Sequence, residues 1–424
     1  MSARISRRTL IASAAVAAAT TTLGRPALAQ SSARVVIIGG GFGGAMAARA
    51  VKRADPRISV TLIEQNRTFT ACPLSNAVVV GLREIRLQQF SYERLAAEGI
   101  ALAYEAATSV DAGTRSVLLN SGTSVPYDRL ILAPGIDFHW EKLAGYNAQA
   151  AEQLPHAWKA GEQTLILRRQ LESLEDGANV LVTVPANPYR CAPAPYERAS
   201  LIAWYLKNRK PRSKVIVLDA KDQFSMQRLF QNAWKELYPD HLEWVSLSDG
   251  GNVTAVEVTN RTVDADFNNY KGGVVNIIPP QKAGRIADIA GVADRTGWCP
   301  VDPVTFESKL QPNMHVLGDA ALLSGMAKSA FAATASAKAC AAAVVKLLAN
   351  GVPSETKLIN ACYSLIAPDY AISIAGVYQP ENGAFAEVEG STASSPVDAP
   401  RELRAAEAKY AEGWFNTITA EVFG

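Results

Sequence analysis

At 424 residues the chain is too long for a single hydrophobic core, and its length suits two or three domains. Its 42 lysines and arginines nearly balance 40 acidic residues, without a basic stripe interleaved with aromatic side chains, which argues against nucleic-acid binding. The four histidines form no close cluster with cysteines, so a structural zinc site is not expected.

Residues 1–30 have the pattern of an export signal. Arg7 and Arg8 form a basic pair, and the apolar run over 10–23 is too short and too rich in alanine to span a membrane. Small residues at 27–29 suit cleavage. The pair lies in Ser-Arg-Arg-Thr-Leu, which favours a twin-arginine signal over an ordinary secretory one. We therefore expect export to a bacterial periplasm, and no later stretch predicts a membrane span.

The next segment predicts a dinucleotide site. Residues 34–38 are a short β-branched run typical of a buried parallel strand, and the run 45–53 predicts a helix. Between them, Gly39 permits a tight turn, Gly41 lets the backbone approach a pyrophosphate, and Gly44 lets helix and strand pack closely. We expect the phosphates to lie at the N-terminus of the helix.

An acidic residue completes this pattern. A second strand over 59–63 ends at Glu64, twenty residues beyond Gly44, where a carboxylate can accept hydrogen bonds from ribose hydroxyls. A glycine-rich turn without a ligand is the alternative, but strand, turn, helix, strand and acid together favour a bound dinucleotide.

Two later segments extend the site. Residues 127–135 predict a strand ending at Gly135 and resemble the second glycine signature of flavoproteins with two dinucleotide folds. Residues 314–320 predict another strand, ending at Gly318, with Asp319 at the mouth of a following helix. In that family, the aspartate binds the flavin ribityl chain. The resemblance implies an FAD-binding domain split into residues 31–150 and 286–355.

Residues 151–285 predict a second α/β domain. Strands over 179–184 and 214–219 flank a helix over 196–208. Where a nicotinamide site needs a glycine turn, the chain is rich in proline, which has no N–H to offer a pyrophosphate. We expect this domain to keep the nucleotide fold without binding NADH, and Asp219 to be a strand-end turn residue.

The C-terminal part, residues 356–424, predicts a small α+β domain. A helix over 329–349 should pack within the FAD-binding domain, residues 360–366 and 370–378 predict strands, and 401–423 predict a terminal helix. The predicted fold class is therefore α/β, with two Rossmann-type domains of the disulfide-reductase flavoprotein kind and a small C-terminal domain.

Cys72 follows the first acidic residue, in Thr-Ala-Cys-Pro, and can lie near the dimethylbenzene edge of a flavin. A thiolate is a capable nucleophile, so attachment at the flavin 8-methyl group is possible chemistry. The residues alone favour a plainer alternative, a buried cysteine that only fills space.

Cys191 lies where the missing nucleotide loop should be, in the crevice between two domains, and is a candidate redox partner of the flavin. It needs a second sulfur, for which Cys362 is preferred and Cys299 is the main competitor. A purely structural disulfide is the alternative. Glu197 could manage protons if burial raises its pKa, or be an ordinary carboxylate at a helix N-terminus. Cys340 suits packing.

The mature chain as a whole resembles the flavoprotein subunit of flavocytochrome c sulfide dehydrogenase, including its SoxF-type relatives. The motifs that carry the resemblance are the glycine turn, Thr-Ala-Cys-Pro at 70–73, the proline-rich segment 188–197, Gly-Trp-Cys-Pro-Val-Asp at 297–302, and Cys-Tyr-Ser-Leu-Ile-Ala-Pro at 362–368. The resemblance implies FAD bound covalently to Cys72 through an 8α-thioether, and a redox-active disulfide between Cys191 and Cys362.

The expected function is oxidation of sulfide to polysulfide or sulfur. The chain has no C-x-x-C-H haem motif, so a separate c-type cytochrome subunit is the expected electron acceptor. One alternative is an enzyme resembling sulfide:quinone oxidoreductase at a membrane, although four acids of the terminal helix suit solvent or a protein partner better: Glu402, Glu407, Glu412 and Glu421. Another is a non-catalytic electron-transfer or reactivating flavoprotein of a sulfur-oxidising complex.

Overall fold

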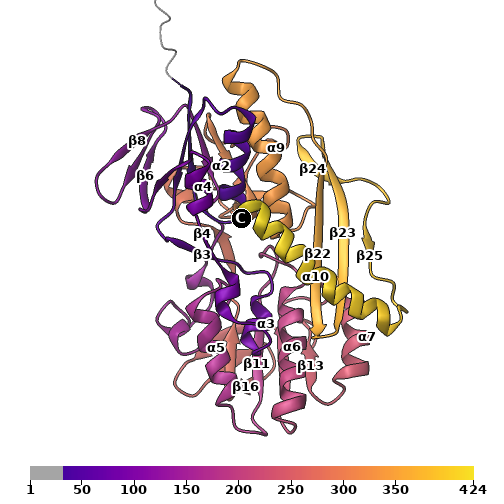
Figure 1. Cartoon of the computed structure of the whole chain (residues 1–424). Helices are drawn as coiled ribbons and strands as arrows, with labels where there is room; N and C mark the ends of the chain where they lie inside the picture. Colours follow the sequence, from indigo (N-terminus) through magenta and orange to yellow (C-terminus); the bar gives the residue numbers. More distant parts are fainter. Residues whose placement is uncertain (1–31) are drawn as a thin grey trace, which may run out of the picture. The chain divides into compact units, whose positions relative to one another are not determined.

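The computed structural model describes residues 32–424, and Ala33–Gly424 pack as one unit (Figure 1). The predicted twin-arginine signal over 1–30 lies outside the described residues.

The first parallel sheet combines distant parts of the chain. Its strand order is β20 (Met314–Val316), β9 (Arg129–Leu132), β1 (Arg34–Ile38), β2 (Ser59–Ile63) and β5 (Ala101–Ala103), all parallel. Helix α2 (Phe42–Ala54) begins three residues earlier than predicted and packs against α9 (Ala330–Leu348). Strands from both parts of the predicted split domain therefore share one sheet.

The second parallel sheet belongs to the inserted segment. Its order is β13 (Leu242–Val245), β12 (Val215–Asp219), β11 (Val180–Val184) and β17 (Val274–Ile277). The helices of this part are α5 (Glu162–Glu172), α6 (Ala194–Arg209) and α7 (Gln227–Leu237). Figure 1 shows them below the first sheet. Two such sheets confirm the predicted α/β fold class of two Rossmann-type domains.

Short antiparallel ribbons, and one parallel pair formed by Cys299–Pro300 and Ala321–Leu322, connect and flank these sheets. The pair β10 (Ile136–Phe138) and β18 (Gln281–Ala283) links the two domains. The small ribbons were not predicted from the sequence. They are β3 (Thr68–Thr70) with β4 (Gln89–Ser91), β6 (Ala107–Asp111) with β7 (Ser116–Leu119) and β8 (Ser124–Pro126), β14 (Val253–Glu257) with β15 (Thr262–Ala265) and β16 (Asn269–Lys271), and β19 (Cys299–Pro300) with β21 (Ala321–Leu322).

The remaining helices are short. They are α3 (Ser75–Val79), α4 (Glu93–Ala97), α8 (Ile286–Ile289), and 3-10 turns at Ile85–Gln88, Trp140–Lys142, Ala150–Glu152 and Gly318–Ala320. Asp319 lies in the last of these turns. Helix α9 begins at Ala330, one residue after the predicted start, so Asp319 is followed first by its own 3-10 turn and only later by that helix.

The C-terminal part forms an antiparallel sheet of β22 (Leu358–Ala367), β23 (Tyr370–Glu381), β24 (Ala384–Glu387) and β25 (Ala393–Ser394), followed by α10 (Arg401–Val422). Strand β22 packs on α6 and α9, and α10 packs on β23 and reaches α2. Figure 1 shows α10 in yellow, crossing in front of the sheet. This part therefore contacts both Rossmann-type domains.

One prediction about α10 is wrong. Glu407 does not face solvent, since it is only 6% exposed and accepts hydrogen bonds from the hydroxyls of Ser373 and Ser395. It also pairs with buried Arg404 at 3.3 Å. Its helix position faces β23, so the carboxylate needs these donors to offset the loss of water. Glu402, Glu412 and Glu421 are exposed as predicted.

Among the described residues, α9 has the length and apolar composition of a helix that could cross a membrane, so the prediction that no later stretch has this character is wrong. Half of its most apolar stretch is buried against the rest of the protein. Its alanines allow close contact with α2 and β22, as is typical of a core helix.

Candidate functional site

A cavity of about 540 Å³ lies where the three parts of the chain meet. All the predicted site residues except Gly44 line it: Gly39, Gly41, Glu64, Cys72, Gly135, Cys191, Glu197, Gly318, Asp319 and Cys362. The first sheet contributes the turn after β1, the inserted domain contributes the start of α6, and the C-terminal sheet contributes β22. Concave sites at such domain junctions are the usual place for a cofactor.

The glycine turn requires its glycines. Gly39 has φ of +101°, and a Cβ there would lie 2.4 Å from the carbonyl oxygen of Ala133. A Cβ on Gly44 would lie 1.8 Å from the carbonyl oxygen of Gly39. Gly44 therefore sets the contact between helix and turn, while Gly39 and Gly41 leave open backbone on the cavity wall.

Glu64 lies beside this turn. Its carboxylate accepts a hydrogen bond from Gly40 N at 2.8 Å and another from Asn66 N at 2.9 Å. It also lines the cavity. The backbone donors fix its orientation, and a carboxylate has lone pairs left for further donors such as ribose hydroxyls.

Three buried donors on the cavity wall have no partner: the Tyr92 hydroxyl and the indole N–H groups of Trp158 and Trp414. Buried polar groups are normally hydrogen-bonded, because an unpaired one costs about 1–3 kcal/mol. Burial also raises the pKa of Tyr92, so its hydroxyl stays protonated. Unpaired donors around a glycine cradle fit an elongated polar ligand such as a dinucleotide.

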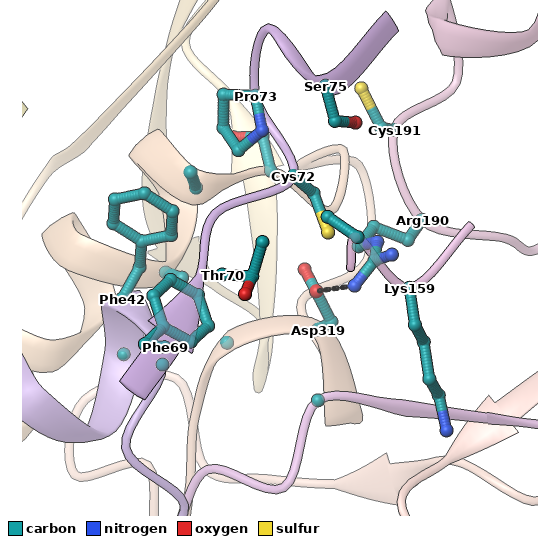
Figure 2. A pocket seen from close by; sticks show the side chains of 18 of the residues that line it. Phe42, Phe69, Thr70, Cys72, Pro73, Ser75, Lys159, Arg190, Cys191 and Asp319 are labelled. Atoms are coloured by element: carbon teal, nitrogen blue, oxygen red, sulfur yellow. Dashed lines mark ion pairs between the residues drawn. The ribbon is translucent and has the colours of Figure 1, made fainter. Parts of the chain in front are cut away.

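Cys72 lies between β3 and α3, and its thiol points to the carbonyl oxygen of Trp158 at 3.7 Å. Figure 2 shows its sulfur near Arg190 and Asp319. The guanidinium of Arg190 lies 3.7 Å from the Asp319 carboxylate and also donates to the Trp158 carbonyl. Arg190 directly precedes Cys191 but carries no motif that predicts it from the sequence as a site residue.

Cys191 has an unusual backbone. Its φ of +59° lies in the left-handed region, which a non-glycine residue adopts at a cost. Its N–H donates to the Lys328 carbonyl at 2.9 Å, and its own carbonyl accepts from Ala194 N at 3.0 Å. These bonds hold the loop against the start of α6, with Cys191 on the cavity wall (Figure 2).

Cys362 lies on β22 and lines the same cavity. Burial raises the pKa of Cys362 to about 11, and burial and then the nearby Cys362 raise the pKa of Cys191 well above its usual value. Both are free thiols in this structure. Cys299 and Cys340 are fully buried and do not line the cavity, so Cys299 is not positioned as the second sulfur.

Glu197 lies in the first turn of α6 and is 8% exposed. Burial raises its pKa to about 7, against the opposing effect of hydrogen bonds from Leu365 N and the Asn76 amide. Its charge in turn raises the pKa of both Cys191 and Cys362. A carboxyl that titrates near neutrality beside two thiols can exchange protons with them.

In the inserted domain, Asp219 stands where a nicotinamide-binding domain has its ribose-binding acid. The carboxylate of Asp219 is already hydrogen-bonded within the protein. Asp219 is 0% exposed and accepts from the Tyr196 hydroxyl at 2.6 Å, Trp244 Nε1 at 3.0 Å and Lys221 Nζ at 2.6 Å. The ring of Phe224 stacks on the ring of Tyr196, with 3.7 Å between their centroids. Aromatic side chains therefore cover this carboxylate, and three donors already occupy its oxygens.

Three family profiles match the chain. They are the central domain of the sulfide dehydrogenase [flavocytochrome c] flavoprotein chain over 164–279, the flavin-binding domain of flavocytochrome c sulphide dehydrogenase over 354–423, and pyridine nucleotide-disulphide oxidoreductase over 33–182. The predicted family is thereby confirmed at the inserted domain and at the C-terminal sheet.

Individual relatives agree with these profiles. The chain is 58% identical over 45 residues to the sulfide dehydrogenase [flavocytochrome c] flavoprotein chain of Chlorobaculum thiosulfatiphilum, covering 94% of that sequence and 11% of this chain. It is 24% identical over 315 residues to the mitochondrial sulfide:quinone oxidoreductase of Mus musculus, covering 69% of this chain and 66% of the relative. The match thus spans just under two thirds of that relative's length.

Solved structures share the fold. The sulfide:quinone oxidoreductase of Aquifex aeolicus superposes with a TM-score of 0.72 at 17% identity, covering 92% of each chain. The putidaredoxin reductase in its covalent complex with putidaredoxin gives a TM-score of 0.66 at 16% identity, covering 89% of this chain and 93% of that one.

Proposed function

This chain belongs to the family of flavocytochrome c sulfide dehydrogenase flavoprotein chains, and from this we propose that it oxidises sulfide to polysulfide or zero-valent sulfur. The observation that carries the proposal is that Cys191, Cys362 and Glu197 line one cavity together with a dinucleotide turn. Thiol–disulfide exchange needs the two sulfurs, and a carboxyl with a pKa near 7 can carry the proton that is released.

FAD is the cofactor that we propose for this cavity. Gly39 and Gly41 would receive its pyrophosphate, Glu64 a ribose, and Asp319 the ribityl chain. Cys72 would hold the flavin covalently as an 8α-thioether. A bound flavin supplies an acceptor for two electrons that can be released one at a time.

Sulfide would enter by thiol–disulfide exchange. In the oxidised enzyme Cys191 and Cys362 form a disulfide, and hydrosulfide makes a new S–S bond to one of these sulfurs as the old bond breaks. A persulfide remains on one cysteine and a thiolate on the other. A second hydrosulfide then bonds to the outer sulfur and leaves with it as the hydrodisulfide anion HSS⁻, and the two reduced cysteines hold the two electrons lost by sulfide.

Glu197 would accept the proton that the attacking hydrosulfide loses. The carboxylate is the base and the carboxylic acid is the product, so the rate of this step should rise as pH increases through the Glu197 pKa near 7. The cavity is shared with both sulfurs, which supports this role.

A c-type cytochrome in the periplasm is the electron acceptor that we propose. The chain has no C-x-x-C-H motif, and the inserted domain buries the acid that would bind a nicotinamide ribose. Transfer of single electrons to a haem partner fits both observations better than hydride transfer does.

The critical experiment replaces one sulfur. Cys191→Ser should bind FAD normally but lose sulfide-dependent reduction of cytochrome c by at least about a hundredfold, because serine cannot form the disulfide. The flavin absorbance of the purified variant measures FAD binding, and stopped-flow absorbance of the cytochrome measures its reduction by sulfide. Cys299→Ala, at a buried cysteine away from the cavity, is the control and should retain turnover. Unchanged turnover in Cys191→Ser would overturn the mechanism.

A further inference from the structure

A single amide joins the three segments that bring cysteines to the cavity. Asn76 lies four residues after Cys72, and its Nδ2 donates to Glu197 Oε2 at 2.8 Å. Glu197 follows Cys191 by six residues, and its Oε1 accepts from Leu365 N at 2.9 Å, three residues beyond Cys362 on β22. The pair of side chains therefore links α3, α6 and β22.

The orientation of this amide is fixed by a neighbouring cation. Arg198 Nε donates to Asn76 Oδ1 at 2.9 Å. A guanidinium can only donate, so the atom that faces it must be the amide oxygen, and the NH₂ group must then face Glu197. Asn76 is 5% exposed and Arg198 is 2% exposed, so water does not compete for these bonds.

Arg198 is itself fixed from the other side. Its remaining nitrogens donate to the carbonyls of His156 and Ala157 and to Asn276 Oδ1 at 2.6–3.0 Å. The guanidinium is thus anchored on the inserted domain and cannot turn towards Glu197 without losing several bonds. A buried chain runs from Asn276 through Arg198 and Asn76 to Glu197.

We propose that Asn76 is a positioning residue that, held by Arg198, keeps the Glu197 carboxylate aimed at the cysteine pair and favours its charged form. This inference rests on the proposed function, in which Glu197 accepts a proton. Asn76 belongs to the segment that carries Cys72, and through Glu197 it would influence proton transfer at Cys191 and Cys362. The side chain acts through Glu197 and itself performs no chemical step.

The groups around Glu197 define what a variant would change. From α3 the facing group is the uncharged amide of Asn76. The other charged or titratable neighbours are Arg198 on the same helix, the thiols of Cys191 and Cys362, and, next to Cys191, Arg190 and Asp319. Substitution of Asn76 leaves all of these groups in place and changes only the hydrogen bonds of this amide, which donates to Glu197 and Ala194 and accepts from Arg198.

The test compares two asparagines that contact the same guanidinium. Asn76→Asp keeps an acceptor for Arg198 but places a second carboxyl against Glu197. The pKa of the pair should rise, and the pH at which sulfide reduces the flavin at half its maximal rate should move up by about one unit or more. Asn276→Asp also keeps an acceptor for Arg198, but the donors that it loses serve the carbonyls of Pro155 and His156 and not Glu197, so its midpoint should move by less than half as much as that of Asn76→Asp.

Asn76→Leu removes the donor to Glu197 and the acceptor for Arg198 Nε without adding a charge, and should move the same midpoint upward by roughly half to one unit. Sulfide ionises equally for every variant, so only differences between variants count. Alkylation of the reduced cysteines with iodoacetamide across pH, followed by mass spectrometry, measures the thiol–carboxyl coupling without turnover. Folding of each variant is checked by its melting temperature and bound flavin.

The variant Glu197→Gln distinguishes a failure of the proposed function from a failure of the inference about Asn76. If it leaves the pH profile of flavin reduction unchanged, Glu197 is not the base and the proposed function loses that step. If Glu197→Gln removes the profile but Asn76→Asp and Asn276→Asp behave alike, only the inference about Asn76 is overturned. An upward shift in Asn76→Asp alone supports it.

Discussion

The residues that carry the chemistry lie in strained or buried positions. Cys191 has φ of +59°, and Leu74, two residues after Cys72, has φ of +63°. Such backbone in non-glycine residues costs about 1–3 kcal/mol and is found mostly where the surrounding structure holds a functional group in place. Both segments line the cavity, so local strain there serves the position of a sulfur atom.

At the same scale, the attachment of the flavin to Cys72 can be tested directly. Wild-type protein denatured in acid should keep its yellow colour on the polypeptide, because a thioether survives conditions that release a bound cofactor. Cys72→Ser should release its flavin into the supernatant. Absorbance and the intact mass of the denatured chain provide the measurement. Complete release of flavin from wild type would show that Cys72 does not form the bond.

Helices α2 and α9 show how small residues position the site. Gly44 on α2 packs against Gly39 of the turn, and Gly43 would meet Leu317 at 2.5 Å if it had a Cβ. The alanines of α9 allow the two helices to lie close together. The first turn of α2 is thereby held against β1, where its free N–H groups can receive a pyrophosphate.

This packing predicts opposite effects for two helical glycines. Gly44→Ala forces a methyl group against the Gly39 carbonyl and should lower the free energy of unfolding by about 1–3 kcal/mol and weaken flavin binding. In Gly413→Ala on α10, the new methyl group meets no atom within 4 Å, and the free energy of unfolding should rise by about 0.5–1 kcal/mol. Urea unfolding and flavin content measure both. Equal effects would contradict the close approach at Gly44.

In the whole molecule, the C-terminal part forms one wall of the cavity, through Cys362 on β22 and Trp414 on α10, and is packed firmly against the first domain. The ring of Phe423 stacks on the rings of Phe69 and Phe90, with 5.2 Å between ring centroids in each pair. The guanidinium of Arg49 donates to the Glu421 carbonyl at 2.6 Å. Helix α10 therefore uses its apolar face to cover the FAD-type domain and β23. That face is not free to enter a membrane, which weighs against a quinone-using enzyme that docks through this helix.

This arrangement predicts the choice of electron acceptor. Protein isolated with its native partners should contain a c-type cytochrome, and sulfide should reduce cytochrome c at least about tenfold faster than a short-chain quinone. Spectra of the haem during turnover, with quinone reduction run in parallel, decide this. Faster quinone reduction would favour the sulfide:quinone oxidoreductase alternative, and a flavin that sulfide does not bleach would favour a non-catalytic electron carrier.

The sequence by itself determined the glycine turn, Glu64, the two Rossmann-type domains and the cysteines worth attention, because these depend on local backbone rules and on the period of hydrophobic residues. Only the tertiary structure decided which groups meet. It brought Cys362 rather than Cys299 to the cavity, buried Glu407, and surrounded Glu197 with Asn76 and Leu365. Burial and pKa depend on neighbours distant in the chain, which no local pattern specifies.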